Sequence, residues 1–330
     1  MIDIDIALVV LNWNGKNLLE QFLPTLIEYS PEASIYLVDN FSTDSSVSFV
    51  KKKFPEISII QHNQNFGFAE GYNKALSLID ADVYGLINSD VEVTPFWLQP
   101  IFKFYNNNQN ASILQPKILD FNHKSYFEYA GAAGGFIDKY GYAYCRGRIF
   151  KHIEEDKDQY GSSSIFWASG ACLFIKSKDY KNLGGFDSDF FAHYEEIDLC
   201  WRAKNNNLSV DYISTSQVYH LGGGTLDTQN PFKTYLNFRN SLFTLIKNLP
   251  EKKIFPVIFS RMLFDGIAAL FFLAKGKPVH TWSVLKAHLQ FYIYATRMYN
   301  KRGEHQHLNY YQTRSMVWNA FIKKQNRFKP

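Results

Sequence analysis

The hydrophobic pattern at the start of the chain alternates between continuous apolar runs and helical spacing. The runs predict buried parallel strands over residues 6–11, 34–38, 57–60 and 83–87. Apolar residues three and four apart, such as Leu19, Phe22, Leu23 and Leu26, predict an amphipathic first helix, and residues 68–79 predict another. This alternation is typical of an α/β fold with a doubly wound, mostly parallel sheet flanked by helices.

Polar residues follow three of these strands, at Asn14, Asp39 and Asp90. The carboxyl ends of parallel strands share one edge of the sheet, where open α/β sheets bind their ligands. Asp90 stands in Asn88-Ser89-Asp90, directly after an apolar strand. A carboxylate there could hold Mg²⁺ or Mn²⁺ against a diphosphate. The same three residues also make a good turn, which is the alternative interpretation.

Residues 65–73 place two glycines four apart, Gly67 and Gly71, at the start of the helix over 68–79. Glycine allows close backbone approach, and free amides at a helix start favour an anion. We therefore expect an anion site here, with small residues that merely serve helix packing as the alternative. The stretch is neither a Walker loop nor a GxGxxG fingerprint, which disfavours P-loop and dinucleotide-binding proteins.

Beyond Asp90 the pattern is looser. It predicts a helix over 96–105, a strand over 112–116, strands or a mobile loop over 126–148, and an exposed loop over 154–164. Residues 166–175 predict a strand with a close backbone approach at Gly170.

Three acids then fall within four residues, Glu195, Glu196 and Asp198. A helix that begins near Glu195 would place Glu195 and Asp198 on one face. Neighbouring acids raise one another's pKa, so one of them could act as a general base. The alternative is a solvated helix start, where the dipole favours acids.

His220 ends a later predicted strand and precedes Gly222-Gly223-Gly224-Thr225. A lone histidine is usually structural. In a chain that already contains a candidate metal carboxylate, His220 becomes a candidate second ligand.

Charge divides the chain into two regions. Residues 1–240 hold 20 Lys/Arg against 28 Asp/Glu, a balance of −8, whereas residues 241–330 hold 15 against 3, a balance of +12. Apolar runs at 235–249, 254–273 and 284–299 predict helices in the basic part. We therefore expect one domain over residues 1–240 and a basic, aromatic-rich helical region over residues 241–330. Three cysteines without ligand spacing disfavour disulfides and zinc.

The basic region suggests where the protein works. The apolar stretch 254–274 carries Arg261 and Asp265, and each charge costs about 2.5–3.5 kcal/mol at the bilayer centre. A spanning helix is thus disfavoured, and an interfacial helix remains. Asp3 and Asp5 interrupt the apolar start of the chain, so we expect no signal peptide and a cytoplasmic protein. We expect it to be peripheral at the inner face of the cell membrane and bound to anionic lipid. The alternative is a soluble cap, packed on the catalytic domain or on a second copy.

The series of motifs resembles the family 2 inverting glycosyltransferases of the GT-A fold, nearest to the rhamnosyltransferase-like branch. Residues 9–15 resemble the opening nucleotide-binding strand, 38–46 the segment that reads the nucleobase, and 65–73 the Asn-x-Gly-Phe-Ala-x-Gly-x-Asn pattern. Residues 86–90 resemble the metal-binding DXD element, with Asn88 in place of its first acid. Residues 195–198 resemble the segment of the catalytic base, with Glu196 in place of its usual Asp. His220 and the pair Arg239-Asn240 resemble the family's later motifs.

The resemblance implies roles for particular residues. Glu196 would be the base, with Glu195 as runner-up. The nucleotide would contact Leu11, Asn12, Asn14, Asp39, Gly67, Gly71, Asn73 and Ser89. Asp90 and His220 would hold Mg²⁺ or Mn²⁺, and acceptor or diphosphate contacts would come from Asp198, Trp167, Gly170 and Arg239.

The implied reaction is inverting transfer of a sugar from a nucleotide-diphosphate donor, dTDP-rhamnose or a UDP-hexose, in the synthesis of cell-surface polysaccharide. The acceptor would be a saccharide or a lipid-linked saccharide. Nucleic acid is not an expected partner, and an oligomer stays open. A sugar nucleotidyltransferase is a competing class, but residues 12–16 lack its usual Gly-rich, basic loop. A non-catalytic nucleotide-sugar-binding subunit is the third.

Overall fold

Strand β1 (Ile6–Asn12) lies in the main sheet between β2 (Ser34–Asp39) and β4 (Val83–Asn88), and it pairs with both in parallel. Its side chains alternate between two buried clusters, with Leu8 in one and Val9 in the other. Burial on both faces explains why this strand is a continuous apolar run. The computed structural model describes residues 4–222, 230–325 and 327–328.

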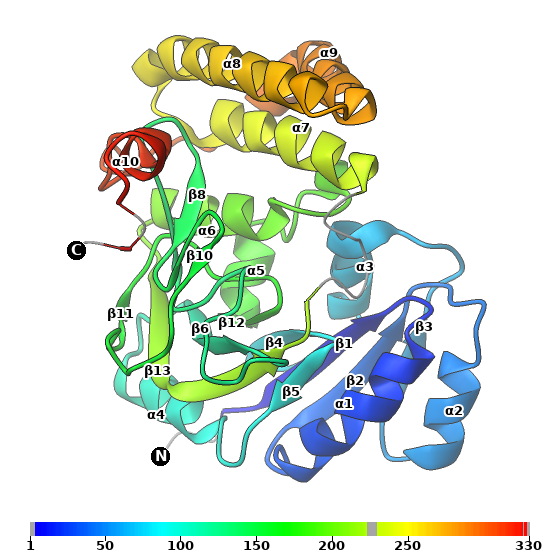
Figure 1. Cartoon of the computed structure of the whole chain (residues 1–330). Coiled ribbons are helices and arrows are strands. Elements are labelled where there is room, and N and C mark those ends of the chain that lie inside the picture. Colours follow the sequence, from blue (N-terminus) through cyan, green and yellow to red (C-terminus); the bar gives the residue numbers. More distant parts are fainter. Residues whose placement is uncertain (1–3, 223–229, 326, 329–330) are drawn as a thin grey trace.

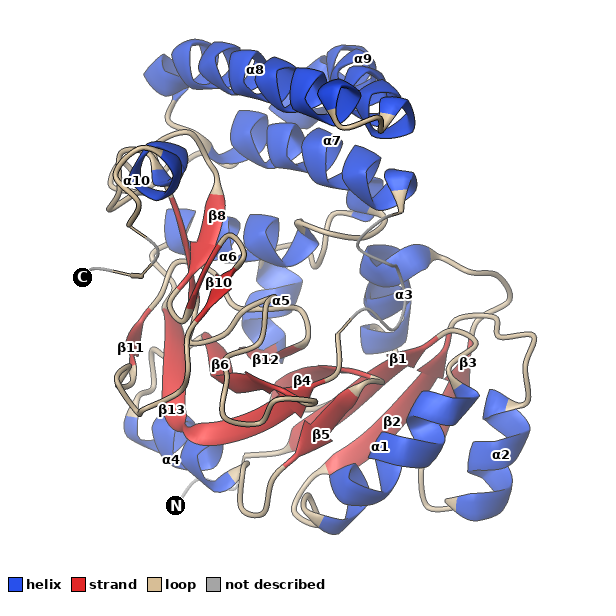
Figure 2. Cartoon of the chain, in the orientation of Figure 1, coloured by secondary structure: helices blue, strands red, loops and turns tan. Residues whose placement is uncertain are grey.

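The main sheet has the order β11-β13-β6-β12-β4-β1-β2-β3, and β5 pairs with β13 (Figures 1 and 2). Its remaining strands are β3 (Ser58–Gln61), β5 (Val91–Val93), β6 (Ile113–Asp120), β11 (Ser163–Ser164), β12 (Cys172–Lys176) and β13 (Val210–His220). β12 runs antiparallel to both of its neighbours, whereas β13 is parallel to β6. The sheet is therefore mixed but mostly parallel, and the carboxyl ends of β1, β2, β4 and β13 share one edge.

Residues 126–148, for which we expected either strands or a mobile loop, contribute strands. They make a small antiparallel sheet of β7 (Gly135–Ile137), β8 (Ala143–Cys145), β9 (Arg148–Ile149) and β10 (His152–Ile153). The strand expected over 166–175 begins only at Cys172, because the residues before it cross to the small sheet, where Gly135 pairs with Trp167.

Helices cover both faces of the main sheet, as expected for the fold class (Figure 1). One face packs on α1 (Lys16–Glu28), α2 (Ser46–Lys53) and α4 (Gln99–Asn107). The other face packs on α3 (Gly67–Leu76), α5 (Ser177–Asn182) and α6 (Glu195–Asn205). A short 3-10 turn, η1 (Ser188–Phe190), precedes α6.

Three C-terminal helices form a layer beyond α6, coloured yellow to orange in Figure 1. They are α7 (Pro231–Asn248), α8 (Glu251–Ala274) and α9 (Pro278–Asn300). The helical character expected for this region is confirmed. The boundary expected at residue 240 falls inside the unbroken helix α7, so α7 physically joins the two regions. A last helix, α10 (Met316–Phe321), returns to the small sheet, where the Met316 amide donates to Asp138.

Helix α8 is long and apolar enough to cross a membrane by length and composition alone. The two charges near its middle face the protein interior. Arg261 Nε donates to Asp265 Oδ1 at 2.9 Å, and Arg261 Nη2 donates to Ser241 Oγ of α7 at 3.0 Å. The pair is almost wholly buried. Helix α8 is thereby anchored to α7 along one side, and its opposite side is exposed.

Several basic residues that we expected to face an anionic surface are instead paired within the chain. Arg261 pairs with Asp265, Arg297 with Asp189, and Lys301 with both Asp187 and Asp189. Arg302 donates to the backbone carbonyls of Ile246 and Leu249. Arg297 and Lys301 thus pair with acids of the first region, whereas Arg261 and Arg302 have their partners within residues 241–330.

Candidate active site

The carboxyl edge of the main sheet gathers the polar residues that follow β1 and β2. Asn12 and Asp39 are direct neighbours in the strand register. Asn12 Nδ2 donates to Asp39 Oδ1 at 3.3 Å and to Ser42 Oγ at 3.1 Å, and both Asn12 and Asp39 are buried. The Ser42 amide donates to Asp39 Oδ2 at 3.1 Å. Asp39 thus lies at the carboxyl edge of the sheet, where we expected the polar residues that follow β1, β2 and β4.

Asn14 closes the same group from the loop after β1. It adopts a left-handed backbone, with φ at 51°, and its Oδ1 accepts from the Thr43 amide at 2.7 Å. Leu11 lies beside Asn88 in the register between β1 and β4. A Cβ added at Gly15 would lie 3.7 Å from Ser89 Oγ, so Ser89 borders the same loop.

Asp90 and His220 meet at this edge although 130 residues separate them. His220 Nε2 lies 3.1 Å from Asp90 Oδ1, and both side chains are buried. The pairing of β13 with β5 brings them together, because His220 lies opposite Val91. Glu128, which sequence reasoning missed, lies with its Oε1 3.4 Å from His220 Nδ1. Burial would lower the pKa of His220, but Glu128 and Asp90 raise it to about 10.

The donor atoms of Asp90 and His220 fit a divalent ion whose other ligands come from a substrate. A carboxylate oxygen suits Mg²⁺ or Mn²⁺, and a His220 nitrogen becomes a ligand when an incoming ion displaces the proton that Glu128 and Asp90 hold on the ring. Over the described residues, no group of three or more His, Cys, Asp or Glu could hold an ion by itself. The oxygens of a diphosphate would have to complete such a site. The Gly-rich stretch after His220 lies outside the described residues from Gly223 onward.

The start of α3 differs from our expectation of an anion site. The Phe68 and Ala69 amides donate to the carbonyl of Phe191, at 2.8 and 3.3 Å. The Gly67 amide donates to Asn65 Oδ1 at 2.8 Å. These amides are therefore occupied within the chain. A Cβ at Gly67, where φ is +74°, would clash with Phe191 at 2.6 Å. The start of α3 therefore serves helix packing, which is the alternative that we gave for this stretch.

Two other residues of that stretch also have partners inside the protein. A Cβ at Gly71 would lie 3.3 Å from Leu11 and 3.4 Å from Asn40, so Gly71 allows α3 to approach β1. Asn73 Nδ2 donates to the Phe186 carbonyl at 2.8 Å, and Asn73 Oδ1 accepts from the Phe186 amide at 2.9 Å. Asn73 thus joins α3 to the loop before α6.

Helix α6 begins at Glu195, as predicted, and its first two residues are the buried Glu195 and the half-buried Glu196. Among the described residues, neither Glu195 Oε2 nor Glu196 Oε2 has a hydrogen-bond partner. Burial and then the charge of Glu196 raise the pKa of Glu195 well above its ordinary range. Burial raises the pKa of Glu196 to about 7, against backbone amides of the helix start that lower it. Two adjacent acids therefore have different tendencies to ionise, and Glu196 is the one poised near neutrality.

A short chain of contacts links Glu196 to the sheet edge. A Cβ at Gly170 would lie 3.8 Å from Glu196 Cβ and 3.5 Å from Phe68. One residue on, the Ala171 carbonyl accepts from the Asn88 amide at 2.9 Å. Asn88 stands two residues before Asp90. The distances at Gly170 are those of ordinary van der Waals contact, so the close backbone approach that we expected there is not seen. The contacts nevertheless place Glu196 beside the carboxyl end of β4.

Three expected acceptor or diphosphate contacts point into the protein instead. Asp198 is fully buried and pairs with Arg202 and Lys247, each at 2.8 Å. Trp167 is buried, and its Nε1 donates to the Phe136 carbonyl at 2.9 Å. Arg239 Nη2 donates to the carbonyls of Asp189 and Phe190. All three side chains have intramolecular partners that account for their position.

Comparisons with known proteins identify relatives of this chain. The family model described as glycosyl transferase family 2 matches residues 7–192. The chain is 25% identical over 219 residues to N-acetylglucosaminyl-diphospho-decaprenol L-rhamnosyltransferase from Mycobacterium tuberculosis, covering 61% of this chain and 71% of that protein. It is 21% identical over 243 residues to a low-salt glycan biosynthesis hexosyltransferase from Haloferax volcanii, covering 72% of this chain and 74% of that protein.

The fold is shared with a solved structure of GalNAc-T7 with UDP, GalNAc and Mn²⁺. The TM-score is 0.59 at 13% sequence identity, and the match covers 90% of this chain and 58% of the other. At that identity the likeness shows the fold alone. The expected GT-A architecture is thereby confirmed.

Proposed function

The chain belongs to glycosyl transferase family 2, and on that premise we propose that it is a metal-dependent, inverting glycosyltransferase. Its donor is a nucleotide-diphosphate sugar, dTDP-rhamnose or a UDP-hexose, and its acceptor is a saccharide or lipid-linked saccharide of a cell-surface polysaccharide. The rhamnosyltransferase and hexosyltransferase names of the two relatives support this choice. The observation that carries the proposal is the placement of Glu196 beside the sheet edge that holds Asp90 and His220.

Asn12, Asn14, Asp39 and their neighbours form the nucleotide end of the site. Asp39 accepts hydrogen bonds from Asn12 and the Ser42 amide, and a carboxylate retains further acceptor capacity beyond these two. It can therefore accept from an N–H of a uracil or thymine ring. Leu11 and Ser89 border this end. Gly67, Gly71 and Asn73 contribute indirectly, because they fix α3 against β1 and the loop before α6.

Asp90 and His220 would hold the Mg²⁺ or Mn²⁺ ion at the diphosphate. Such an ion, when bound, neutralises the negative charge that develops on the leaving group. The chain also has to hold the acceptor sugar between this group and Glu196. In this arrangement Asp90 would lie toward the diphosphate and Glu196, next to Gly170, would lie toward the acceptor, on the opposite side of the donor sugar.

Glu196 is the proposed base. An acceptor hydroxyl has a pKa far above 7, so its proton must pass to a carboxylate as the oxygen attacks. The oxygen–carbon bond forms at the anomeric centre while the bond to the diphosphate breaks on the opposite face, which inverts the centre. The proton remains on Glu196 and the electron pair leaves with the nucleoside diphosphate. Burial and the charge of Glu196 raise the pKa of Glu195 well above its ordinary range, so Glu195 is the less suitable base.

A donor panel tests the proposal. We expect one of several UDP-, dTDP- and GDP-sugars to raise the melting temperature in the presence of Mn²⁺ and to release nucleoside diphosphate when a saccharide acceptor is added. Glu196→Gln should retain the melting shift and lose the release. Binding without release in the wild type would indicate a non-catalytic binding subunit. No shift with any donor would contradict the assignment.

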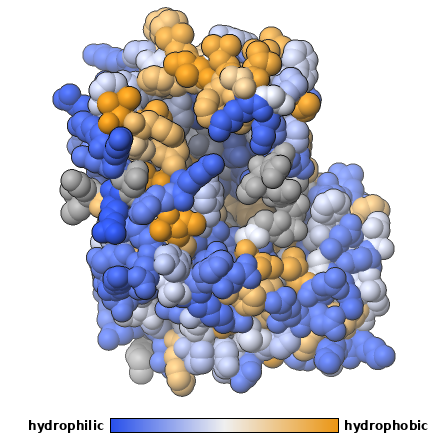
Figure 3. Space-filling view, in the orientation of Figure 1, coloured by the Kyte–Doolittle hydropathy of each residue, from blue (hydrophilic) through white to orange (hydrophobic). Residues whose placement is uncertain are grey.

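We also propose that the protein works at the cytoplasmic face of an anionic membrane. Helices α8 and α9 together carry twelve large apolar residues that are each more than half exposed: Phe255, Phe259, Leu263, Ile267, Leu270, Phe271, Leu273, Val279, Trp282, Leu289, Tyr292 and Ile293. Figure 3 shows this apolar surface at the top of the molecule. Single exposed apolar residues are common on protein surfaces, whereas a group of this size indicates an interaction surface.

Charge favours an anionic bilayer over a second copy as the occupant of this face. Lys252, Lys275 and Lys277 are exposed near the ends of α8, and Lys286 is exposed on α9. Asp265 is the only acid in residues 252–300, and it is buried. Two copies packed through this face would bring like charges together, whereas anionic headgroups attract each lysine by about 1 kcal/mol.

Co-sedimentation with vesicles tests the membrane assignment separately from catalysis. We expect the full chain to sediment with phosphatidylglycerol vesicles at low salt, and less so at high salt or with phosphatidylcholine. The double variant Leu263→Glu, Ile267→Glu should stay in the supernatant. Leu78→Glu, at an exposed leucine of another surface, is the matched control and should behave as the wild type. A wild-type protein that stays in the supernatant at low salt would leave the soluble cap as the correct interpretation.

A further inference from the structure

The loop over residues 187–194 leads directly into the two glutamates and has an unusual backbone. Phe191, His193 and Tyr194 adopt left-handed conformations, with φ at 65°, 69° and 74°. Residues with a Cβ rarely occupy this region, and such a backbone persists only where its surroundings hold it. The direction in which Glu196 points therefore depends on contacts made to this loop from outside it.

Helix α7 supplies side chains that hold the backbone of the loop. The buried Asn240 Nδ2 lies within hydrogen-bond distance of three carbonyl oxygens, those of Phe190 at 3.0 Å, Ala192 at 2.9 Å and His193 at 2.7 Å. The neighbouring Arg239 Nη2 donates to the carbonyl of Asp189 at 2.9 Å and to that of Phe190 at 3.0 Å. Arg239 Nε also donates to Asn240 Oδ1 at 2.8 Å, so the two side chains fix each other.

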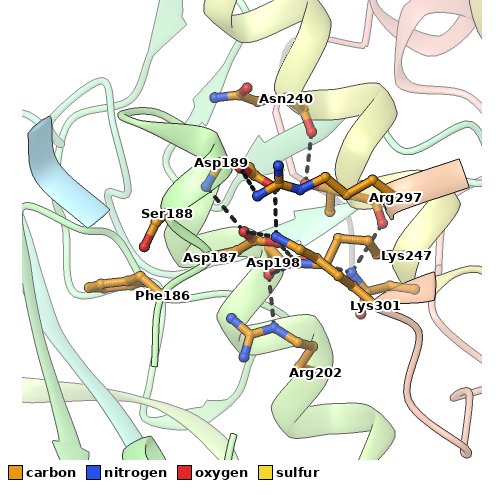
Figure 4. Close-up of polar contacts among 12 residues, drawn as sticks. Phe186, Asp187, Ser188, Asp189, Asp198, Arg202, Asn240, Lys247, Arg297 and Lys301 are labelled. Atoms are coloured by element: carbon orange, nitrogen blue, oxygen red, sulfur yellow. Dashed lines mark hydrogen bonds and ion pairs between the residues drawn. The ribbon is translucent and has the colours of Figure 1, made fainter. Parts of the chain in front are cut away.

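Lys247, two turns farther along α7, ties the two ends of the loop together (Figure 4). Its Nζ donates to Asp187 Oδ2 at 2.7 Å, where the loop begins, and to Asp198 Oδ2 at 2.8 Å, in the first turns of α6. Burial would raise the pKa of Asp187, but Lys247 and Lys301 hold it well below its ordinary range. Both carboxylates are therefore charged, and a buried ammonium group joins them.

Helix α9 adds ion pairs that differ in how strongly solvent screens them. Lys301 contacts both Asp187 and Asp189, whereas Arg297 contacts Asp189 alone. The Arg297 side chain is 59% exposed, so solvent screens its ion pair. Lys247 is 3% exposed, and its removal would leave two buried carboxylates without their shared cation. The loop thus depends on Asn240 and Lys247 far more than on Arg297.

We propose that α7 is a positioning element of the active site, in which Asn240 and Lys247 hold residues 187–194 so that Glu196 faces the acceptor. This inference rests on the proposed function of Glu196 as the base. It gives the pair Arg239-Asn240 a role toward the protein backbone. Helix α7 lies wholly beyond the residues that match the family model, so on this proposal the catalytic unit extends past that match.

Two measurements on Asn240→Ala test the proposal. The first is hydrogen–deuterium exchange, which should increase in peptides covering residues 187–196 and stay unchanged in β1 and β4. The second is steady-state kinetics. We expect kcat to fall by about 10-fold or more, because a misplacement of about 1 Å can lower a rate 10²-fold. The donor KM should stay within about twofold, since the nucleotide end of the site is untouched.

Lys247 supplies a second, independent pair of variants. Lys247→Met should reproduce both effects, and Lys247→Arg should restore most of the turnover because it retains the cation. Arg302→Gln is the matched control. Arg302 also donates to backbone carbonyls of this region, at Ile246 and Leu249, but it does not contact the loop. We expect Arg302→Gln to leave kcat unchanged.

The outcomes separate this inference from the proposed function. A wild-type protein without transferase activity would overturn the proposed function, while the exchange measurement would still report on the loop. Wild-type kcat in both Asn240→Ala and Lys247→Met would overturn the positioning role. So would a loss of kcat without increased exchange at 187–196, or an equal loss in Arg302→Gln. If Asn240→Ala does not fold, the comparison of Lys247→Met with Lys247→Arg decides.

Discussion

The carboxyl group of Glu196 gives a quantitative prediction about pH. Its pKa is raised from an ordinary 4.5 to about 7 by burial at the start of α6. A base must be ionised, so activity requires pH values above this pKa. At pH 6 only about a tenth of the enzyme would carry the ionised base, and kcat/KM should fall about tenfold for each further pH unit. An unperturbed glutamate would place the same loss more than two units lower.

The assay is the initial rate of nucleoside diphosphate release with saturating acceptor, measured from about pH 5 to pH 9. Glu196→Gln should lower turnover by roughly 10²–10⁴ and remove the dependence on pH below 7. Glu195→Gln is the matched control, because it makes the same change one residue earlier, in a group whose pKa is raised well above its ordinary range. It should retain the tenfold loss per unit. If Glu195→Gln abolishes the acid limb and Glu196→Gln retains it, the assignment of the base is wrong.

Three further predictions concern single residues. Asp90→Asn should lower turnover at least 10²-fold and remove the response to added Mn²⁺ without lowering the melting temperature, and a variant that transfers at the wild-type rate would rule out the metal role. Asp39→Ala should weaken the binding of UDP or dTDP in calorimetry; an unchanged Kd would exclude contact with the nucleobase. Glu195→Gln should stabilise the protein above about pH 5. The pKa of Glu195 is raised in the folded state, so stability is lost as pH rises from the unfolded pKa toward the folded one. The advantage of the variant should grow by up to about 1.4 kcal/mol per pH unit in urea unfolding, and no advantage at pH 8 would show that Glu195 is ionised in the fold.

Local patterns were sufficient for the parallel half of the sheet. The run from Ile6 to Leu11 is apolar because both faces of β1 are covered, and that property is legible in the sequence itself. The same holds for the start of α6 at Glu195, where three acids mark the positive end of a helix. The common edge of Asn14 and Asp39 followed from the rule that parallel strands end at one edge.

Contacts between distant segments could not be predicted in this way. β12 inserts antiparallel between β4 and β6, and no local signal distinguishes its direction. Glu128 reaches His220 only because the segment after β6 folds back beside β13. The amides at the start of α3 are occupied by the carbonyl of Phe191, more than 120 residues away, so the anion site expected from Gly67 was not found.

The partners of the charged residues in the C-terminal region could not be predicted from the sequence either. Its positive balance was evident from composition, but composition does not tell which cations have partners. Arg297 and Lys301 pair with the acidic loop before α6, and Arg261 pairs with Asp265 in its own helix. The exposed lysines near the ends of α8 are those that remain for an anionic surface.

The anomeric configuration of the transferred sugar tests the central claim most directly. The claim is that Glu196 directs the acceptor to the face of the donor sugar opposite the diphosphate. Once the donor panel has identified a substrate, proton NMR of the first product, recorded before any anomeric equilibration, reports the configuration. We predict a product whose anomeric centre is inverted relative to the donor, formed by the wild type and absent with Glu196→Gln. A product with retained configuration would contradict the account.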